Sequence, residues 1–109
     1  MTYNDLVTAL TGTGIPFAEG AWRNAEDLRE DYGVYAIDGA DDLGADNSHA
    51  ERLWEGTVDL FCRNSPGYTQ CAVVEAALNA AGCWWRLNSR QYENETGLTH
   101  WEWVFRCIP

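Results

Sequence analysis

The two histidines are the side chains best suited to acid–base chemistry near neutral pH. His49 follows an acidic segment, and His100 lies in a segment that alternates apolar and polar residues. An imidazole becomes catalytic when a nucleophile or a second titratable group is held beside it. Neither histidine has such a partner at a recognisable motif spacing, and the chain lacks a G-x-S-x-G elbow. We therefore expect two solvated histidines and no enzyme active site.

The acidic segment from Asp38 to Asn47 is the next candidate for chemistry, because calcium prefers several carboxylate oxygens together. An EF-hand loop needs oxygen ligands at its first, third and fifth positions. Counted from Asp38 the third position is Ala40, and counted from Asp42 it is Gly44. The pattern fails from either start, so the segment is predicted to be a solvated loop without a metal or cofactor.

The four cysteines show neither C-x-x-C pairing nor the spacing of a zinc site. They are Cys62, Cys71, Cys83 and Cys107. The first residues, Met1–Asp5, form neither a basic nor an apolar leader, so we expect no secretion. Reduced thiols are therefore favoured over a disulfide pair.

The charge balance limits the class of partner. The formal net charge is −10, from 17 acidic and 7 basic side chains, and every basic residue is an arginine. A negative field repels phosphate, so no sequence-specific nucleic-acid binding is expected. No apolar run approaches the roughly 20 residues of a membrane span, so no membrane partner is expected.

The size of the chain predicts one domain, residues 1–109, with one hydrophobic core. The hydrophobic share of 46% is typical of a globular fold. Six Trp, five Tyr and three Phe exceed what a core of this size requires. Some of these rings are therefore expected at the surface, where large aromatics often contact a partner.

Residue periodicity predicts two helices and four to five strands. The predicted elements are a helix carrying Tyr3 to Leu10, a short edge strand at Ile15–Ala18, a strand at Tyr32–Ile37, a long strand including Trp54 to Cys62, a helix capped by Thr69 and ended by Gly82, and a hairpin of Cys83–Tyr92 with Leu98–Ile108. Thr2 with Asp5 resembles a capping box at the start of the first helix, with Asp in place of Glu. A single helical turn is also predicted at Asn24–Arg29. Two helices packed on one face of a mostly antiparallel sheet define an α+β two-layer sandwich.

Alternation along the predicted strands identifies the core. The apolar side of the long strand carries Trp54, Val58, Leu60 and Cys62, with Leu53 and Phe61 as exceptions on the polar side. The apolar side of the last strand carries Trp101, Trp103, Phe105 and Cys107. Trp84 and Trp85 must face opposite sides of the sheet. We expect Trp85 in the core and Trp84, or whichever of the pair faces outward, at a subunit contact.

Several short motifs occur in a characteristic order along nearly the whole chain. They are Thr13-Gly14-Ile15-Pro16, Tyr32-Gly33-Val34-Tyr35, Ala45-Asp46-Asn47, Leu60-Phe61 and Glu75-Ala76-Ala77-Leu78. In this order they resemble the tail-completion, or tail-terminator, family of small structural proteins from long-tailed bacteriophages. The tryptophan-rich terminal hairpin and the four cysteines depart from the pattern of that family.

The resemblance implies a virion protein without catalytic, metal-binding or cofactor-binding residues, present in the host bacterial cytoplasm during assembly. Such subunits form rings, commonly hexamers, that cap the tail tube and join it to the head connector. The implied partners are copies of the same chain, the tail tube and the head connector. Two alternatives stay open: a neck or minor capsid protein at the head–tail joint, and a small module that binds a peptide or ligand through surface aromatics.

Acidic residues lining the bore of such a ring would keep passing DNA from sticking. We therefore expect the acidic segment to face a lumen or a neighbouring subunit. The candidate residues for the subunit interface or the lumen are Asp38, Asp41, Asp42, Asp46, Asn47, Trp84 and Trp54.

Overall fold

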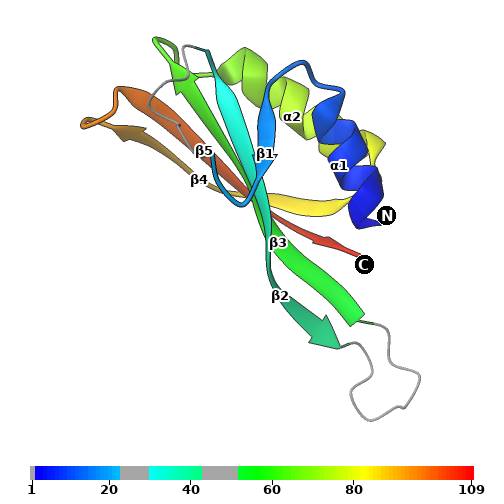
Figure 1. Ribbon diagram of the computed structural model, residues 1–109. Coiled ribbons are helices and arrows are strands. Elements are labelled where there is room, and N and C mark those ends of the chain that lie inside the picture. Colours follow the sequence, from blue (N-terminus) through cyan, green and yellow to red (C-terminus); the bar gives the residue numbers. More distant parts are fainter. Residues whose placement is uncertain (1, 23–29, 43–51) are drawn as a thin grey trace.

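The computed structural model describes residues 2–22, 30–42 and 52–109. Its two helices are α1 (Tyr3–Thr11) and α2 (Tyr68–Ala80). Its strands are β1 (Phe17–Glu19), β2 (Tyr32–Asp42), β3 (Arg52–Arg63), β4 (Trp84–Glu93) and β5 (Leu98–Cys107). Both helices lie on the same face of a single twisted sheet (Figure 1). The predicted α+β two-layer architecture is confirmed.

The strands follow the order β1-β2-β3-β5-β4 across the sheet. All neighbouring pairs are antiparallel except β1 and β2, which are parallel. Pro16 directly precedes β1 on one edge of the sheet, which is where a residue without a backbone N–H is tolerated. The central strands β3 and β5 therefore supply most of the buried sheet surface, and β4 forms the other edge.

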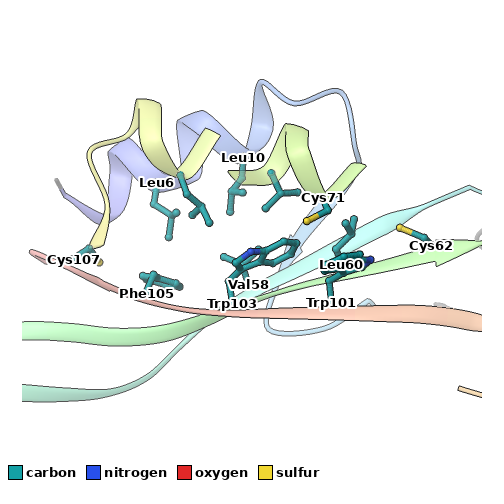
Figure 2. Close-up of a cluster of buried hydrophobic side chains, with 12 residues drawn as sticks. Leu6, Leu10, Val58, Leu60, Cys62, Cys71, Trp101, Trp103, Phe105 and Cys107 are labelled. Atoms are coloured by element: carbon teal, nitrogen blue, oxygen red, sulfur yellow. The ribbon is translucent and has the colours of Figure 1, made fainter. Parts of the chain in front are cut away.

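The core lies between the helices and one face of β3 and β5 (Figure 2). The sheet contributes Val58, Leu60, Cys62, Trp101, Trp103, Phe105 and Cys107, and the helices contribute Leu6, Leu10, Cys71, Val74 and Leu78. The predicted alternation is thus confirmed on both strands. Trp103 is fully buried, and its indole N–H donates to Glu75 Oε2 at 2.9 Å, so its polar atom has a partner inside the fold.

The first helix begins at a reciprocal cap, as the sequence predicts. The Asp5 backbone N–H donates to Thr2 Oγ1 at 3.2 Å, and the Thr2 N–H donates to Asp5 Oδ2 at 3.0 Å. These two bonds satisfy amides that have no partner within the helix. The same bonds lower the pKa of the Asp5 carboxyl, because they favour its charged form.

The second helix begins two residues earlier than predicted and without a side-chain cap. Its N-cap is Gly67 at φ 78°, a left-handed conformation that glycine adopts without strain, rather than Thr69. A Cβ at Gly67 would also lie 2.5 Å from the Cys62 sulfur and 3.0 Å from the Trp101 Nε1 atom. Tight packing of the loop onto the core therefore decides where this helix starts.

The end of the second helix agrees with the prediction. Gly82 has φ 75° and its N–H donates to the Asn79 carbonyl at 3.0 Å. The Cys83 N–H donates to the Leu78 carbonyl at 3.1 Å. This pair of bonds is a Schellman motif, which turns the chain out of the helix and into β4.

The strand β2 is longer than the sequence predicts. The prediction ends it at Ile37 and makes Asp38–Asn47 a loop, but the strand runs on to Asp42 with a bulge between Ile37 and Gly39. Pairing with β3 overrides the low strand propensity of aspartate and glycine. Residues 43–51, with Asp46 and Asn47, and the predicted turn at 24–29 lie outside the described residues.

Gly56 in β3 has no room for a side chain. A Cβ there would lie 2.1 Å from the Ala36 carbonyl oxygen and 2.7 Å from the Phe105 ring. In the same hairpin, a Cβ at Gly39 would meet no atom within 4 Å. The two glycines therefore form a matched pair for testing the packing of the sheet.

We predict that Gly56→Ala lowers the free energy of unfolding by about 1–3 kcal/mol or more, because the new methyl group overpacks the site. Gly39→Ala should change it by less than about 1 kcal/mol. Urea unfolding followed by tryptophan fluorescence measures both values. Equal free energies of unfolding for the two variants would contradict the close approach at Gly56.

Candidate subunit interface and the open face of the sheet

The face of the sheet opposite the helices carries a row of rings. The Tyr32 and Phe61 rings stack with centroids 4.8 Å apart, and the Phe61 and His100 rings stack at 4.3 Å. Trp22 meets the edge of Tyr32 at 6.5 Å, and its indole N–H donates to the Gly33 carbonyl at 2.8 Å. Phe61, an exception to the predicted alternation, is therefore the centre of an aromatic row on the uncovered face.

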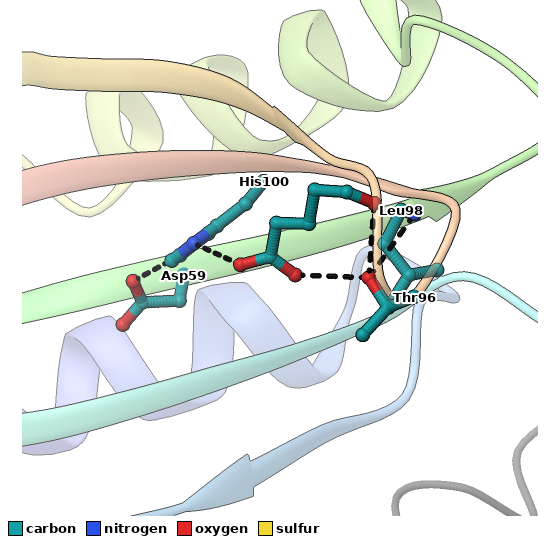
Figure 3. Close-up of polar contacts among 5 residues, drawn as sticks. Asp59, Thr96, Leu98 and His100 are labelled. Atoms are coloured by element: carbon teal, nitrogen blue, oxygen red, sulfur yellow. Dashed lines mark hydrogen bonds and ion pairs between the residues drawn. The ribbon is translucent and has the colours of Figure 1, made fainter.

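His100 lies between two carboxylates rather than in solvent, so the expectation of a solvated side chain is wrong. Its Nε2 atom is 2.7 Å from Asp59 Oδ1, and its Nδ1 atom is 3.5 Å from Glu93 Oε2 (Figure 3). The hydrogen bond to Asp59 raises the pKa of His100, and burial of the ring opposes this rise. The His100 ring thus links β3, β5 and the end of β4.

The arrangement around His100 favours ion pairing. Each ring nitrogen faces a carboxylate, so a substrate would have to displace Asp59 or Glu93 to reach the ring. In the part of the chain that the structure describes, no group of three or more His, Cys, Asp or Glu could hold a metal ion. His49 lies outside the described residues.

The thiols are poorly suited to nucleophilic chemistry. All four cysteines are free. Burial raises the pKa of Cys62 to about 12 and the pKa values of Cys71 and Cys83 to about 11. These thiols are therefore protonated near neutral pH, and a thiol is a much weaker nucleophile than a thiolate.

We predict that His100→Gln changes the pH dependence of folding stability. Because the folded-state pKa of His100 is raised above 6.5, its stabilisation is fully present below that value and is lost as the pH rises through the folded pKa. The stability advantage of the wild type over His100→Gln should therefore be largest below about pH 6.5 and shrink as the pH rises above that value. Urea unfolding of both proteins on both sides of this pH measures the effect, and parallel curves would contradict it.

The strand β4 forms an exposed edge. Within the described residues no strand pairs with its outer side. Large apolar side chains nevertheless remain accessible along it: Trp84 is 49% exposed, Leu87 42% and Tyr92 64%, with Tyr68 of α2 at 63%. An unpaired edge with apolar side chains is a template for a further strand. This edge is therefore our candidate subunit interface.

Two arginines cover aromatic rings at this edge. The Arg106 guanidinium carbon lies 4.7 Å from the centre of the Trp84 ring. The Arg90 guanidinium carbon lies 5.1 Å from the Tyr68 ring and 5.3 Å from the Trp101 ring. Such pairs hold the side chains in place at a surface, and arginines with exposed aromatics are common anchors in interfaces.

The predicted tryptophan candidates lie in different environments. Trp84 faces outward, as expected of one member of the Trp84-Trp85 pair. Trp85 packs against the core and donates its indole N–H to Asn79 Oδ1 at 2.9 Å. Trp54 also packs against the core, with its ring 5.6 Å from the Tyr3 ring. Of these three, only Trp84 presents a largely exposed ring at the β4 edge.

The predicted acidic candidates that lie within the described residues are on the opposite side of the sheet. Asp38 is exposed at the bulge in β2, and Asp41 and Asp42 continue that strand. The pairing of β3 with β5 ends at Trp54, so the last two pairs, Asp41 with Leu53 and Asp42 with Arg52, belong to a two-stranded arm. Since β3 and β5 separate β2 from β4, the fold does not bring the acidic residues and Trp84 together in one subunit.

The sequence prediction missed the exposed residues Tyr68, Leu87, Arg86, Arg90 and Tyr92. For the four of these residues that lie in β4 the sequence carries a signal. The strand reads Trp-Trp-Arg-Leu-Asn-Ser-Arg-Gln-Tyr-Glu and lacks the regular alternation of β3 and β5. A strand with apolar and polar residues mixed on both faces is typical of an edge.

Comparison of the sequence with protein families and with curated proteins offers no guide to these surfaces. No family model matches the sequence, and no curated protein is recognisably similar to it. Among the described residues, neither helix is long and apolar enough to cross a membrane.

Proposed function

We propose that this chain is a non-enzymatic structural subunit of a bacteriophage tail that associates with copies of itself in a ring. In that role it caps the tail tube and joins it to the head connector. The single observation that carries the proposal is the long exposed edge strand β4 with its apolar side chains. The order of motifs that resembles the tail-terminator family supports the same role.

The architecture suits repeated contacts between identical chains. A contact between two different surfaces of the same chain, repeated by rotation, closes into a ring. The sheet has two different edges, a three-residue strand β1 beside β2 on one side and the ten-residue strand β4 on the other. A heterologous contact therefore has two distinct surfaces available.

The charge of the chain supports a bore through which DNA passes. The net charge of −10 repels phosphate, and Asp38 stands exposed on the β2–β3 hairpin. A ring with carboxylates along its lumen would keep the DNA from adhering.

We predict that the purified chain forms closed oligomers as its concentration rises. Native mass spectrometry across a concentration series should show a monomer giving way to one defined oligomer, and negative-stain images of the same sample should show rings. A strict monomer at the highest concentration would contradict self-association in solution. Binding of the rings to isolated tail tubes, and not to heads alone, would separate the tail-terminator role from that of a neck or minor capsid protein.

A second candidate function is a small binding module, which one feature of the open face favours. A recess of about 400 Å³ lies beside β2 and is lined by Trp22, Tyr32, Val34, Asp59 and Phe61, among others. Aromatic walls with one carboxylate suit a cationic side chain or a small organic cation. A tight one-to-one complex with such a ligand, without self-association, would favour this function over the structural one.

A further inference from the structure

We propose that the contact between subunits is strand addition, in which β4 of one copy pairs with the outer edge of residues 37–42 in β2 of the next copy. This inference rests on the proposed self-association and specifies its geometry. It would extend the sheet of one subunit into the sheet of its neighbour around the ring.

The free edges of the sheet lie at its two opposite ends. The short strand β1 pairs only with Gly33, Val34 and Tyr35 of β2. In the described residues, the outer edge of β2 beyond Tyr35 therefore has no strand partner, and neither has the outer edge of β4. Backbone donors and acceptors at such edges gain partners when a second strand pairs with them. Each chain thus carries one half of the contact at each end of its sheet.

The two free edges carry opposite charge. Along β4, Arg86 and Arg90 are exposed, and the single acidic residue, Glu93, closes the strand beside His100. The distal half of β2 carries Asp38, Asp41 and Asp42 and no basic residue. Opposite charges on facing strands stabilise their pairing, whereas like charges directly opposite destabilise it.

The same charges favour a ring over a symmetric dimer. Pairing of β4 with β4 would bring Arg86 and Arg90 of the two copies together, and pairing of β2 with β2 would bring the aspartates together. Only the pairing of β4 with β2 joins basic to acidic. Because this contact uses two different surfaces, it repeats from copy to copy and closes by rotation.

The shape of the edges is compatible with close approach of a second backbone. Gly39 and Ala40 are small and exposed, and a Cβ on Gly39 would meet no atom within 4 Å. A bulge interrupts β2 between Ile37 and Gly39, and another interrupts β4 between Leu87 and Ser89. Bulges interrupt strand pairing, so the longest unbroken stretch of the shared ladder is the four residues of β2 beyond its bulge, with a matching stretch of β4.

The test is a charge exchange between the two edges, read by native mass spectrometry. One variant carries Arg86→Glu with Arg90→Glu, and the other carries Asp38→Arg with Asp41→Arg. Each variant alone should need at least about tenfold more protein than the wild type to assemble, because it places like charges in every contact. An equimolar mixture should assemble again, since each edge then finds an edge of opposite charge on the other variant.

Two controls separate this inference from general effects of charge and folding. Asn4→Glu with Thr8→Glu adds acidic groups to exposed positions of α1, on the side of that helix opposite its buried Leu6 and Leu10, and should assemble as the wild type does. Circular dichroism and thermal unfolding of each variant show whether it folds, and recovery of assembly in the mixture shows it independently.

The outcomes distinguish this inference from the proposed function. If the wild type forms rings and both variants also do, or if the mixture fails to recover, the pairing of β4 with β2 is wrong while self-association stands. If the wild type stays monomeric throughout, both proposals are contradicted. Loss of assembly in each variant with recovery in the mixture supports the pairing.

Discussion

Within the described residues, helices cover the sheet on one face only, and this constraint shapes the rest of the molecule. Two short helices bury the apolar side of β3 and β5, with Trp103 and Phe105 fully enclosed beneath them. Burial of apolar side chains such as these is the main driving force for folding. In the same described part of the chain, the opposite face has no second layer of helices or strands, so it depends on side chains within the sheet. The stacked row of Tyr32, Phe61 and His100 serves that purpose.

Both edges of the sheet also present backbone groups without a strand partner in the described residues. Natural sheets usually discourage pairing of such edges with other chains by charges, proline or bulges. Here Pro16 precedes one edge strand, bulges interrupt β2 and β4, and arginines or aspartates stand along the free stretches. Bulges and like charges on facing strands disfavour indiscriminate pairing. In the proposed assembly the same features would select a neighbouring edge of opposite charge.

The sequence predicts the elements that local periodicity determines and misses those that distant pairing determines. Alternation in β3 and β5 identifies the core correctly, and the capping pattern at Thr2 and Asp5 identifies the first helix. The extension of β2 to Asp42 could not be predicted, because it depends on a ladder with β3. The setting of His100 was equally hidden, since Asp59 and Glu93 reach it from two other strands. The strand order that places β4 at an edge is not encoded locally, although the irregular alternation of β4 is a local sign of an edge strand.

The most direct test of association through the sheet edges is hydrogen–deuterium exchange at two protein concentrations, one below and one above the onset of assembly. Strand addition predicts that assembly slows exchange in β4 and in residues 37–42 of β2, while the central strands β3 and β5 change little. Protection that appears instead on the helices, or exchange at both edges that is the same in monomer and oligomer, would contradict the claim that these chains associate through the edges of their sheets.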